Sequence, residues 1–178
     1  MSYNREAMKR LGQVVFALLA IVALIYGTGW MLPVAHTASS TATFAATSQE
    51  VYDVVADVAA YPRWWTDVER VEILPPVEGR IRFRQHSTDV ITMEVVEATP
   101  PSRFVTRIAD TEQPFGGTWT FEIVPEASGT RLTITERGEV YDPLFRFMSR
   151  FVFGHTGTMN SFLGSLREVF QARTDAKK

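Results

Sequence analysis

The chain of 178 residues contains no cysteine, which excludes disulfide bonds, thiolate metal sites and a cysteine nucleophile. Its three histidines, His36, His86 and His155, fall on three different expected elements, and no HxH or HxxxH spacing occurs. The pattern therefore predicts no metal site, and nothing in the sequence indicates a cofactor. The formal net charge of −2 lacks the basic excess of nucleic-acid-binding proteins, so no nucleic-acid partner is expected.

Charge is also absent from one long segment near the N-terminus. No charged residue occurs between Leu11 and Ala35, and the 19 residues Val14–Leu32 are mostly apolar. At ~1.5 Å per residue, a helix of this length nearly spans a hydrocarbon core of ~30 Å. Tyr26 and Trp30 lie toward one end of the segment, where aromatic side chains would meet a membrane interface.

This segment predicts a single-pass transmembrane anchor over residues 11–34, and a cleaved signal peptide is the main alternative. The basic residues Arg5, Lys9 and Arg10 precede it. The positive-inside rule therefore predicts that residues 1–10 are cytoplasmic and that the domain after the anchor is extracytoplasmic. Both alternatives place that domain outside the cytoplasm.

The residues that follow, 36–173, are expected to form one soluble domain, with a flexible tail over 174–178. Residues 36–46 indicate a first strand, and from about Val71 the hydrophobic period is two in about six further segments. This pattern, with its short connections, predicts an antiparallel sheet. The side chains expected on its inner face include Ile81, Phe83, Gln85, Ile91, Met93, Val95, Phe104, Thr106, Ile108, Trp119, Phe121, Ile123, Leu132, Ile134 and Glu136.

Two short helices are expected between the first strand and the others. Thr47 and Glu50 form a capping box, and valines follow at i, i+3, i+4 and i+7 from Val51. Pro62 ends that helix, because the residue before a proline resists the helical conformation. The segment from Pro62 to Trp65 then opens a second short helix or turn.

The longest helical pattern begins at Asp142, which can cap free amides, and at Pro143, which suits a first helical turn. Apolar residues then recur at helical spacing, and the pattern predicts one long helix ending near Arg173. The apolar positions are Leu144, Met148, Phe151, Met159, Phe162, Leu166 and Val169, with His155 among them.

Three glycines, Gly154, Gly157 and Gly164, interrupt this helical pattern. Each costs on the order of 1 kcal/mol in a helix relative to alanine, so each needs a reason. One interpretation is a kink or break around Gly154–Gly157, which would widen a pocket. The other is close packing of the helix backbone on the sheet, and the spacing alone leaves both open.

The order of elements is an α+β helix-grip arrangement, in which a curved antiparallel sheet of about six or seven strands wraps a long C-terminal helix. EVYDVVADVAAYPRWWTDV and GGTWTFEIVPEASGTRLTITERGEVYDPLFRFMSRFVFG resemble the START-like, Bet v 1-like (SRPBCC) superfamily, in its polyketide cyclase/dehydrase branch. The resemblance covers roughly residues 38–170 and implies the fold. The superfamily includes lipid carriers, hormone receptors and aromatase/cyclases, so it implies no single function and no catalytic signature.

A helix that crosses a strongly curved sheet can leave a mostly apolar cavity with few polar groups. The sequence therefore predicts a membrane-anchored protein that binds a small hydrophobic ligand, such as a lipid, a quinone or a polyketide-like compound. The side chains expected to line the cavity are Trp65, Phe83, Gln85, Met93, Thr106, Trp119, Phe121, Glu136, Met148, Phe151, His155 and Met159.

Two of these residues, Glu136 and His155, are also the candidates for catalysis. Together they could form an acid–base pair within reach of a ketone or enol, as a cyclase or dehydratase would need. Each has a structural alternative: a core or rim histidine, and a glutamate that a bulge at Gly138 turns to solvent. A third possibility is an accessory domain of an envelope assembly whose interior is filled by side chains. The oligomeric state stays open.

Overall fold

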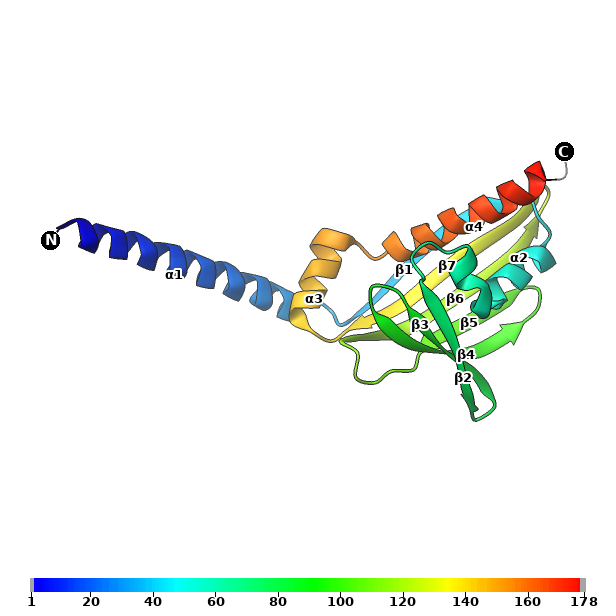
Figure 1. The fold of residues 1–178 in the computed structure, drawn as a ribbon, viewed down its shortest axis with the longest axis horizontal. Coiled ribbons are helices and arrows are strands. Elements are labelled where there is room, and N and C mark those ends of the chain that lie inside the picture. The colour runs from blue at the N-terminus through cyan, green and yellow to red at the C-terminus, as the bar shows by residue number, and fades with distance from the viewer. Residues whose placement is uncertain (1, 177–178) are drawn as a thin grey trace. The chain divides into compact units, whose positions relative to one another are not determined.

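The computed structural model describes residues 2–176, apart from the side chains of residues 2–7 and 153 (Figure 1). The chain forms two compact units. One unit combines the residues up to Val34 with Val140–Gly154, and the other combines Ala35–Glu139 with the residues from His155 onward.

The second unit is built on a seven-stranded antiparallel sheet with the strand order β1-β7-β6-β5-β4-β3-β2. Apart from the return of β1 to pair with β7, each strand pairs with its neighbour in sequence, as the short polar turns predict. The strands are β1 (Ala35–Phe44), β2 (Arg70–Val77), β3 (Arg80–His86), β4 (Val90–Thr99), β5 (Arg103–Ile108), β6 (Phe115–Glu126) and β7 (Gly129–Val140).

Helix α4 (Gly157–Asp175) lies along the inner face of this sheet (Figure 1). Its buried face presents Met159, Phe162 and Leu166, none of which is exposed to solvent. The ring of Phe162 lies 4.9 Å from that of Trp65 and 5.4 Å from that of Phe121, between centroids. Close-packed aromatic rings of this kind bury a large apolar area and hold the helix on the sheet. The helix-grip fold is thereby confirmed.

The two short helices predicted after the first strand are present as α2 (Ser48–Ala56) and the 3₁₀ helix η1 (Val58–Arg63). The capping box is confirmed, because the Thr47 hydroxyl accepts from the Glu50 amide and the Glu50 carboxylate accepts from the Thr47 amide. The Tyr61 hydroxyl donates to the Val55 carbonyl at 2.7 Å. That bond satisfies a carbonyl at the end of α2, where no further helical amide follows.

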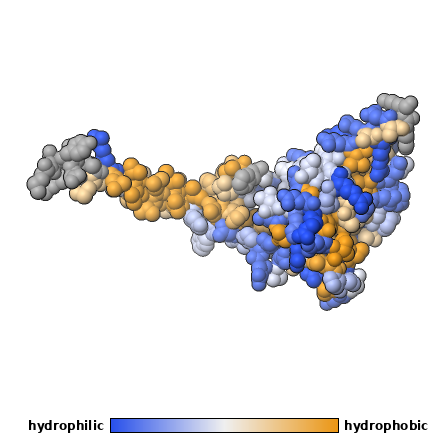
Figure 2. All heavy atoms as spheres, viewed as in Figure 1, coloured by the Kyte–Doolittle hydropathy of each residue, from blue (hydrophilic) through white to orange (hydrophobic). Residues whose placement is uncertain are grey.

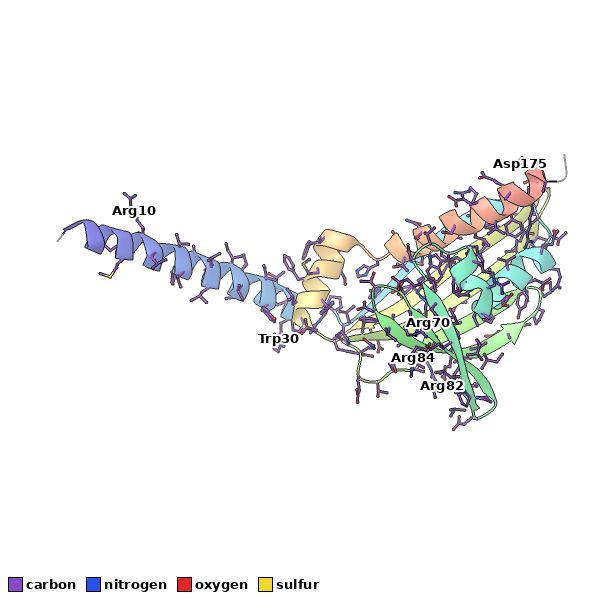
Figure 3. All side chains as sticks on the ribbon, viewed as in Figure 1. Arg10, Trp30, Arg70, Arg82, Arg84 and Asp175 are labelled. Carbon is purple, nitrogen blue, oxygen red and sulfur yellow. The ribbon has the colours of Figure 1, made fainter. Side chains whose placement is uncertain are left out.

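The outer face of the sheet carries cross-strand ion pairs. Arg70, Arg82 and Arg84, labelled in Figure 3, lie along β2 and β3. The carboxylate of Glu94, buried on this face, contacts Arg107 and lies 3.6 Å from Arg80. A buried carboxylate is tolerable here because two guanidinium groups balance its charge.

The first unit contains α1 (Ser2–Met31), α3 (Pro143–Met148) and the π-helical turn η2 (Ser149–Phe153). Within α1, residues 8–31 are long and apolar enough to cross a membrane, and Figure 2 shows apolar residues along most of this helix. A membrane anchor and a signal sequence both fit that description.

The single continuous helix predicted from Asp142 to Arg173 is wrong, because the structure has two helical segments separated by a break. Asp142 caps α3 as expected, because its carboxylate accepts a hydrogen bond from the Phe145 amide at 3.0 Å. The chain then leaves the helix at Gly154, whose φ of +71° favours glycine, and α4 begins only at Gly157. Of the two interpretations of the glycines, the break at Gly154–Gly157 is confirmed. Close packing is not the reason for Gly164, because a Cβ there would meet nothing within 4 Å.

Two further expectations need correction. Ile81, predicted on the covered inner face, is 56% exposed because the outer end of the β2–β3 hairpin projects beyond the core. Residues 174 and 175, expected in a flexible tail over 174–178, belong to α4, which continues to Asp175, and residues 177–178 lie outside the described residues.

Candidate functional site

The inner face of the sheet has a filled part and a partly open part. In the filled part, Phe83, Phe121 and Ile134 are at most 2% exposed. The partly open part lies toward one end of the strands, where the inner-face side chains are only half-buried. It consists of Gln85, Ile91, Met93, Ile108, Trp119 and Glu136, together with His36 at the start of β1.

Glu136 is the acidic group of this open end, and β7 directs it inward in phase with Leu132 and Ile134. Its Oε2 accepts a hydrogen bond from Trp119 Nε1 at 3.1 Å, and its Oε1 lies 3.2 Å from His36 Nε2. The Glu136 side chain is 23% exposed to solvent. Each oxygen is therefore oriented by a neighbour, and the carboxylate still reaches solvent or a bound molecule.

His36 was not among the residues predicted from the sequence. Its position follows from the pairing of β1 with β7, which places His36 opposite Gly138 and Ala38 opposite Glu136. Gly138 has no side chain, so the imidazole can extend across β7 toward the carboxylate. The alternation from His36 to Phe44 could have indicated an inward histidine, because both share one strand phase.

His155 completes the cluster from the other side, where the chain approaches α4. Its ring stacks on that of His36 with a centroid distance of 3.9 Å and an interplanar angle of 25°. The structure therefore brings the two predicted residues, Glu136 and His155, into one cluster through a third residue. We name His36, Trp119, Glu136 and His155 the polar cluster.

The polar cluster has the groups needed for hydrogen bonding and proton transfer. When Nε2 of His36 donates to Glu136, Nδ1 carries the lone pair and can accept a proton or a hydrogen bond. The carboxylate would stabilise the imidazolium that results. Among residues 2–176, no three His, Asp or Glu side chains are arranged to hold a metal ion. The side chains of the cluster themselves offer acids, bases and hydrogen-bonding groups.

The other predicted lining residues are distributed among three environments. Phe83, Phe121, Met159, Trp65 and Thr106 are buried in the core, each at most 4% exposed. The Trp65 indole N–H has no hydrogen-bond partner and is buried, so this ring is held by aromatic packing.

Met148 and Phe151 belong to the first unit, in α3 and η2, and Phe151 is exposed. Gln85 and Met93 lie at the open end described above. The twelve expected lining residues thus contribute to a core, to an open end and to a separate helix.

Three open surface clefts also occur on the second unit. One, of about 490 Å³, lies between the α2–η1 region and α4 and includes Trp64 and Val169. Another of about 490 Å³ is lined by residues of β1, β5, β6 and β7, and one of about 520 Å³ lies beside the end of α4. None of these three is lined by a residue of the polar cluster.

A curved antiparallel sheet gripping a C-terminal helix, with a few polar groups at one end of its inner face, defines a helix-grip protein of the START-like class. Residues 35–171 match the family described as polyketide cyclase / dehydrase and lipid transport, and the chain belongs to that family. No functionally curated protein matches this chain.

Solved structures with the same fold include three related types. The di-domain ARO/CYC protein StfQ, from the steffimycin biosynthetic pathway, is 13% identical with a TM-score of 0.66. The match covers 80% of this chain and 53% of StfQ, so the chain spans about half of that protein.

A START superfamily protein from Mycobacterium smegmatis is 21% identical with a TM-score of 0.63, over 77% of this chain and 98% of that one. The Zhui aromatase/cyclase from a Streptomyces species is 18% identical with a TM-score of 0.63, over 79% and 96%. At these identities the likeness establishes the fold, and function has to be argued from the site.

Proposed function

We propose that this chain is a membrane-anchored binding protein for a small hydrophobic ligand, held at the open end of the inner face against the polar cluster. The observation that carries the proposal is the half-buried carboxylate of Glu136, oriented by Trp119 and His36 at an end of the inner face that also presents half-buried apolar side chains. Such a surface suits a lipid, quinone or polyketide-like compound with one polar group.

Apolar burial would supply most of the affinity, at about 25 cal/mol per Å² before the costs of ordering. The half-buried side chains of Ile91, Met93 and Ile108 offer this apolar contact. A hydroxyl or protonated amine of the ligand would donate to Glu136, and a carbonyl would accept from an imidazole N–H. The match to a family that includes lipid transport supports this reading.

The membrane anchor is supported by contacts inside the first unit. The Arg146 guanidinium donates to the Leu32 carbonyl at 2.9 Å, just beyond the end of α1. A Cβ added at Gly29 would stand 1.9 Å from the Pro143 carbonyl oxygen, so the two backbones touch. Cleavage of α1 as a signal peptide would remove both partners, and we therefore favour a retained anchor.

The proposed orientation places the residues before the span in the cytoplasm and the second unit outside it, because Lys9 and Arg10 precede the apolar segment. A reporter fused after Lys178 tests this orientation. A reporter that is active only outside the cytoplasm should give a signal. A signal from a reporter that is active only inside the cytoplasm would overturn the proposed topology.

Native mass spectrometry of the detergent-extracted full chain tests the binding function. The expected result is a co-purified hydrophobic compound, or binding of at least one member of a panel of phospholipids, quinones and polycyclic ketones. A chain that purifies empty and binds no member of the panel would contradict the proposal. That outcome would favour an accessory domain of an envelope assembly.

The second candidate is an enzyme of the cyclase or dehydratase type, and the His36–Glu136 contact of 3.2 Å favours it. In this reading, an imidazole of the cluster removes a proton from carbon next to a ketone, and Glu136 stabilises the imidazolium. The resulting enolate would then attack a second carbonyl or expel a leaving group.

Hydrogen exchange into β-tetralone, a bicyclic ketone, provides a test that needs no native substrate. In D₂O the wild-type chain should accelerate exchange of the protons next to the carbonyl, while His36→Ala, His155→Ala and Glu136→Gln should not. Equal exchange by wild type and all three variants would exclude the enzymatic reading for this class of ketone.

A further inference from the structure

Residues 143–152 form an apolar helix that the described protein does not bury. Their sequence, PLFRFMSRFV, covers α3 and most of η2, and none of these side chains is buried. Phe145 is 47% exposed, and Phe151 and Val152 are each 58% exposed. A folded chain seldom leaves several neighbouring large apolar side chains in water without a partner surface.

The break at Gly154 separates this segment from helix α4. In sequence, the helical spacing of apolar residues continues from Leu144 to Val169, with His155 at one of the positions. In the structure, the part from Met159 onward packs on the sheet, and Gly154 ends the preceding helical segment with a positive φ. The first part of the pattern, residues 144–152, belongs to the first unit, where its exposed side chains need a partner surface.

The position of this segment on α1 indicates that partner. Pro143 contacts the backbone of α1 at Gly29, and Arg146 donates to the carbonyls of Leu32 and Tyr141 at 2.9 and 3.2 Å. The first bond satisfies the Leu32 carbonyl just after α1, where no helical amide remains to do so. Helix α3 is thereby fixed to the end of the apolar, membrane-length helix.

That end of α1 carries the aromatic residues of a membrane interface. Trp30, labelled in Figure 3, is 76% exposed and Tyr26 is 45% exposed. Indole and phenol rings concentrate at the level of the lipid headgroups. Helix α3 begins at Pro143, which contacts Gly29, the neighbour of Trp30. Helix α3 therefore starts at the same depth in the membrane as Trp30.

We propose that residues 143–152 lie in the headgroup layer of a phospholipid bilayer, with Phe145, Phe151 and Val152 inserted toward the acyl chains. The exposed Arg150 would reach lipid phosphates, as basic residues on such interfacial helices do. The apolar surface of α1 continues into this segment, which is why a bilayer rather than a second copy of the chain is the expected partner. The inference rests on the proposed anchor, and it adds a second membrane contact beyond the span.

Site-directed spin labelling tests this contact, and the absence of cysteine makes it simple. Three single-cysteine variants of the full chain, Val22→Cys, Phe151→Cys and Asp89→Cys, are labelled and placed in phosphatidylcholine–phosphatidylglycerol nanodiscs. All three positions are exposed in the folded chain, so folding should tolerate them. The measured quantity is the ratio of collisions with oxygen to collisions with a water-soluble nickel chelate.

The ratio should be highest at position 22, intermediate at position 151 and lowest at position 89, which lies in the β3–β4 turn. A label at 151 as accessible to the nickel chelate as that at 89 would overturn the inference while leaving the anchor intact. A water-accessible label at 22 would overturn the anchor itself. Spin–spin broadening at 151 that disappears on dilution into excess nanodiscs would show a second copy as the partner and would also overturn the inference.

Discussion

His36 and Gly138 face each other across β1 and β7, and the imidazole occupies the space that a side chain at 138 would fill. A Cβ added at Gly138 would stand 2.3 Å from His36 Cε1 and 2.5 Å from Nε2. It would also stand 2.9 Å from Glu136 Oε1, so the glycine makes room for the whole hydrogen-bonded pair. This glycine is part of the site although it contributes no functional group.

Replacing that glycine should therefore damage the site more than the fold. Gly138→Ala should displace the His36 ring from Glu136 and lower the free energy of unfolding by about 1–3 kcal/mol, the usual cost of overpacking. Loss of the co-purified compound, seen by native mass spectrometry, should accompany the change. Full occupancy in a variant that melts like the wild type would show that the His36–Glu136 contact is not needed for binding.

Gly164 provides the opposite expectation within α4. A Cβ there would enter open space, and its backbone is helical. Gly164→Ala should raise the free energy of unfolding by up to about 1 kcal/mol, because alanine restricts the unfolded chain and favours the helix. Chemical denaturation measures this change, and a destabilised variant would mean that α4 approaches another surface at this position.

The buried phenol of Tyr61 should make the folded protein less stable at alkaline pH. Burial, with a smaller contribution from the charge of Asp57, raises the pKa of its phenol well above the ordinary value of 10.0. Above pH 10 the unfolded chain loses this proton while the folded chain keeps it, so stability falls as the pH rises further.

Tyr61→Phe should remove that alkaline loss of stability. It should also cost about 1–3 kcal/mol at neutral pH, because the Val55 carbonyl loses its donor at 2.7 Å. Urea unfolding at neutral pH and above pH 10 measures both effects. If the free energy of unfolding of the variant fell with pH above 10 as steeply as that of the wild type, groups other than Tyr61 would cause the loss of stability.

The contact between α1 and α3 can be tested with two glycines of the same helix. Gly29→Ala should force α3 away, since the new Cβ would lie 1.9 Å from the Pro143 carbonyl oxygen. Gly27→Ala is the matched control, because nothing lies within 4 Å of its added Cβ.

A spin label at position 151 should become more mobile in Gly29→Ala and stay unchanged in Gly27→Ala. Equal mobility in both variants would contradict the docking of α3 on the end of α1 that the Arg146–Leu32 bond indicates.

Local patterns predicted much of the fold. The capping box at Thr47 and the period of two in β3 to β7 depend on neighbouring residues only, and both are confirmed. The break at Gly154 was not decided by the sequence, because the apolar spacing is the same on both sides of it. Helical periodicity reports which residues could share a face, and tertiary contacts decide whether the helix continues.

The site shows the same division. The inward phase of Glu136 follows from strand alternation within β7, and the structure has it inward. Its pairing with His36 joins residues 100 positions apart and depends on the register of β1 with β7. No local pattern specifies that register. The sequence therefore predicted Glu136 on the inner face but not its contact with His36. Phe121 and Met159, expected at the cavity wall, lie buried in the core, and strand or helix periodicity does not distinguish these two kinds of inward position.

The most direct test of the proposed binding site is to fill its open end. Met93 is half-buried on the inner face of β4, and Met93→Trp should occupy the space that a ligand would use. Glu122→Trp places the same side chain on the exposed outer face of β6 and is the matched control. Native mass spectrometry of both variants should show the bound compound retained in Glu122→Trp and lost in Met93→Trp. Equal occupancy in two folded variants would contradict a ligand at this end of the sheet.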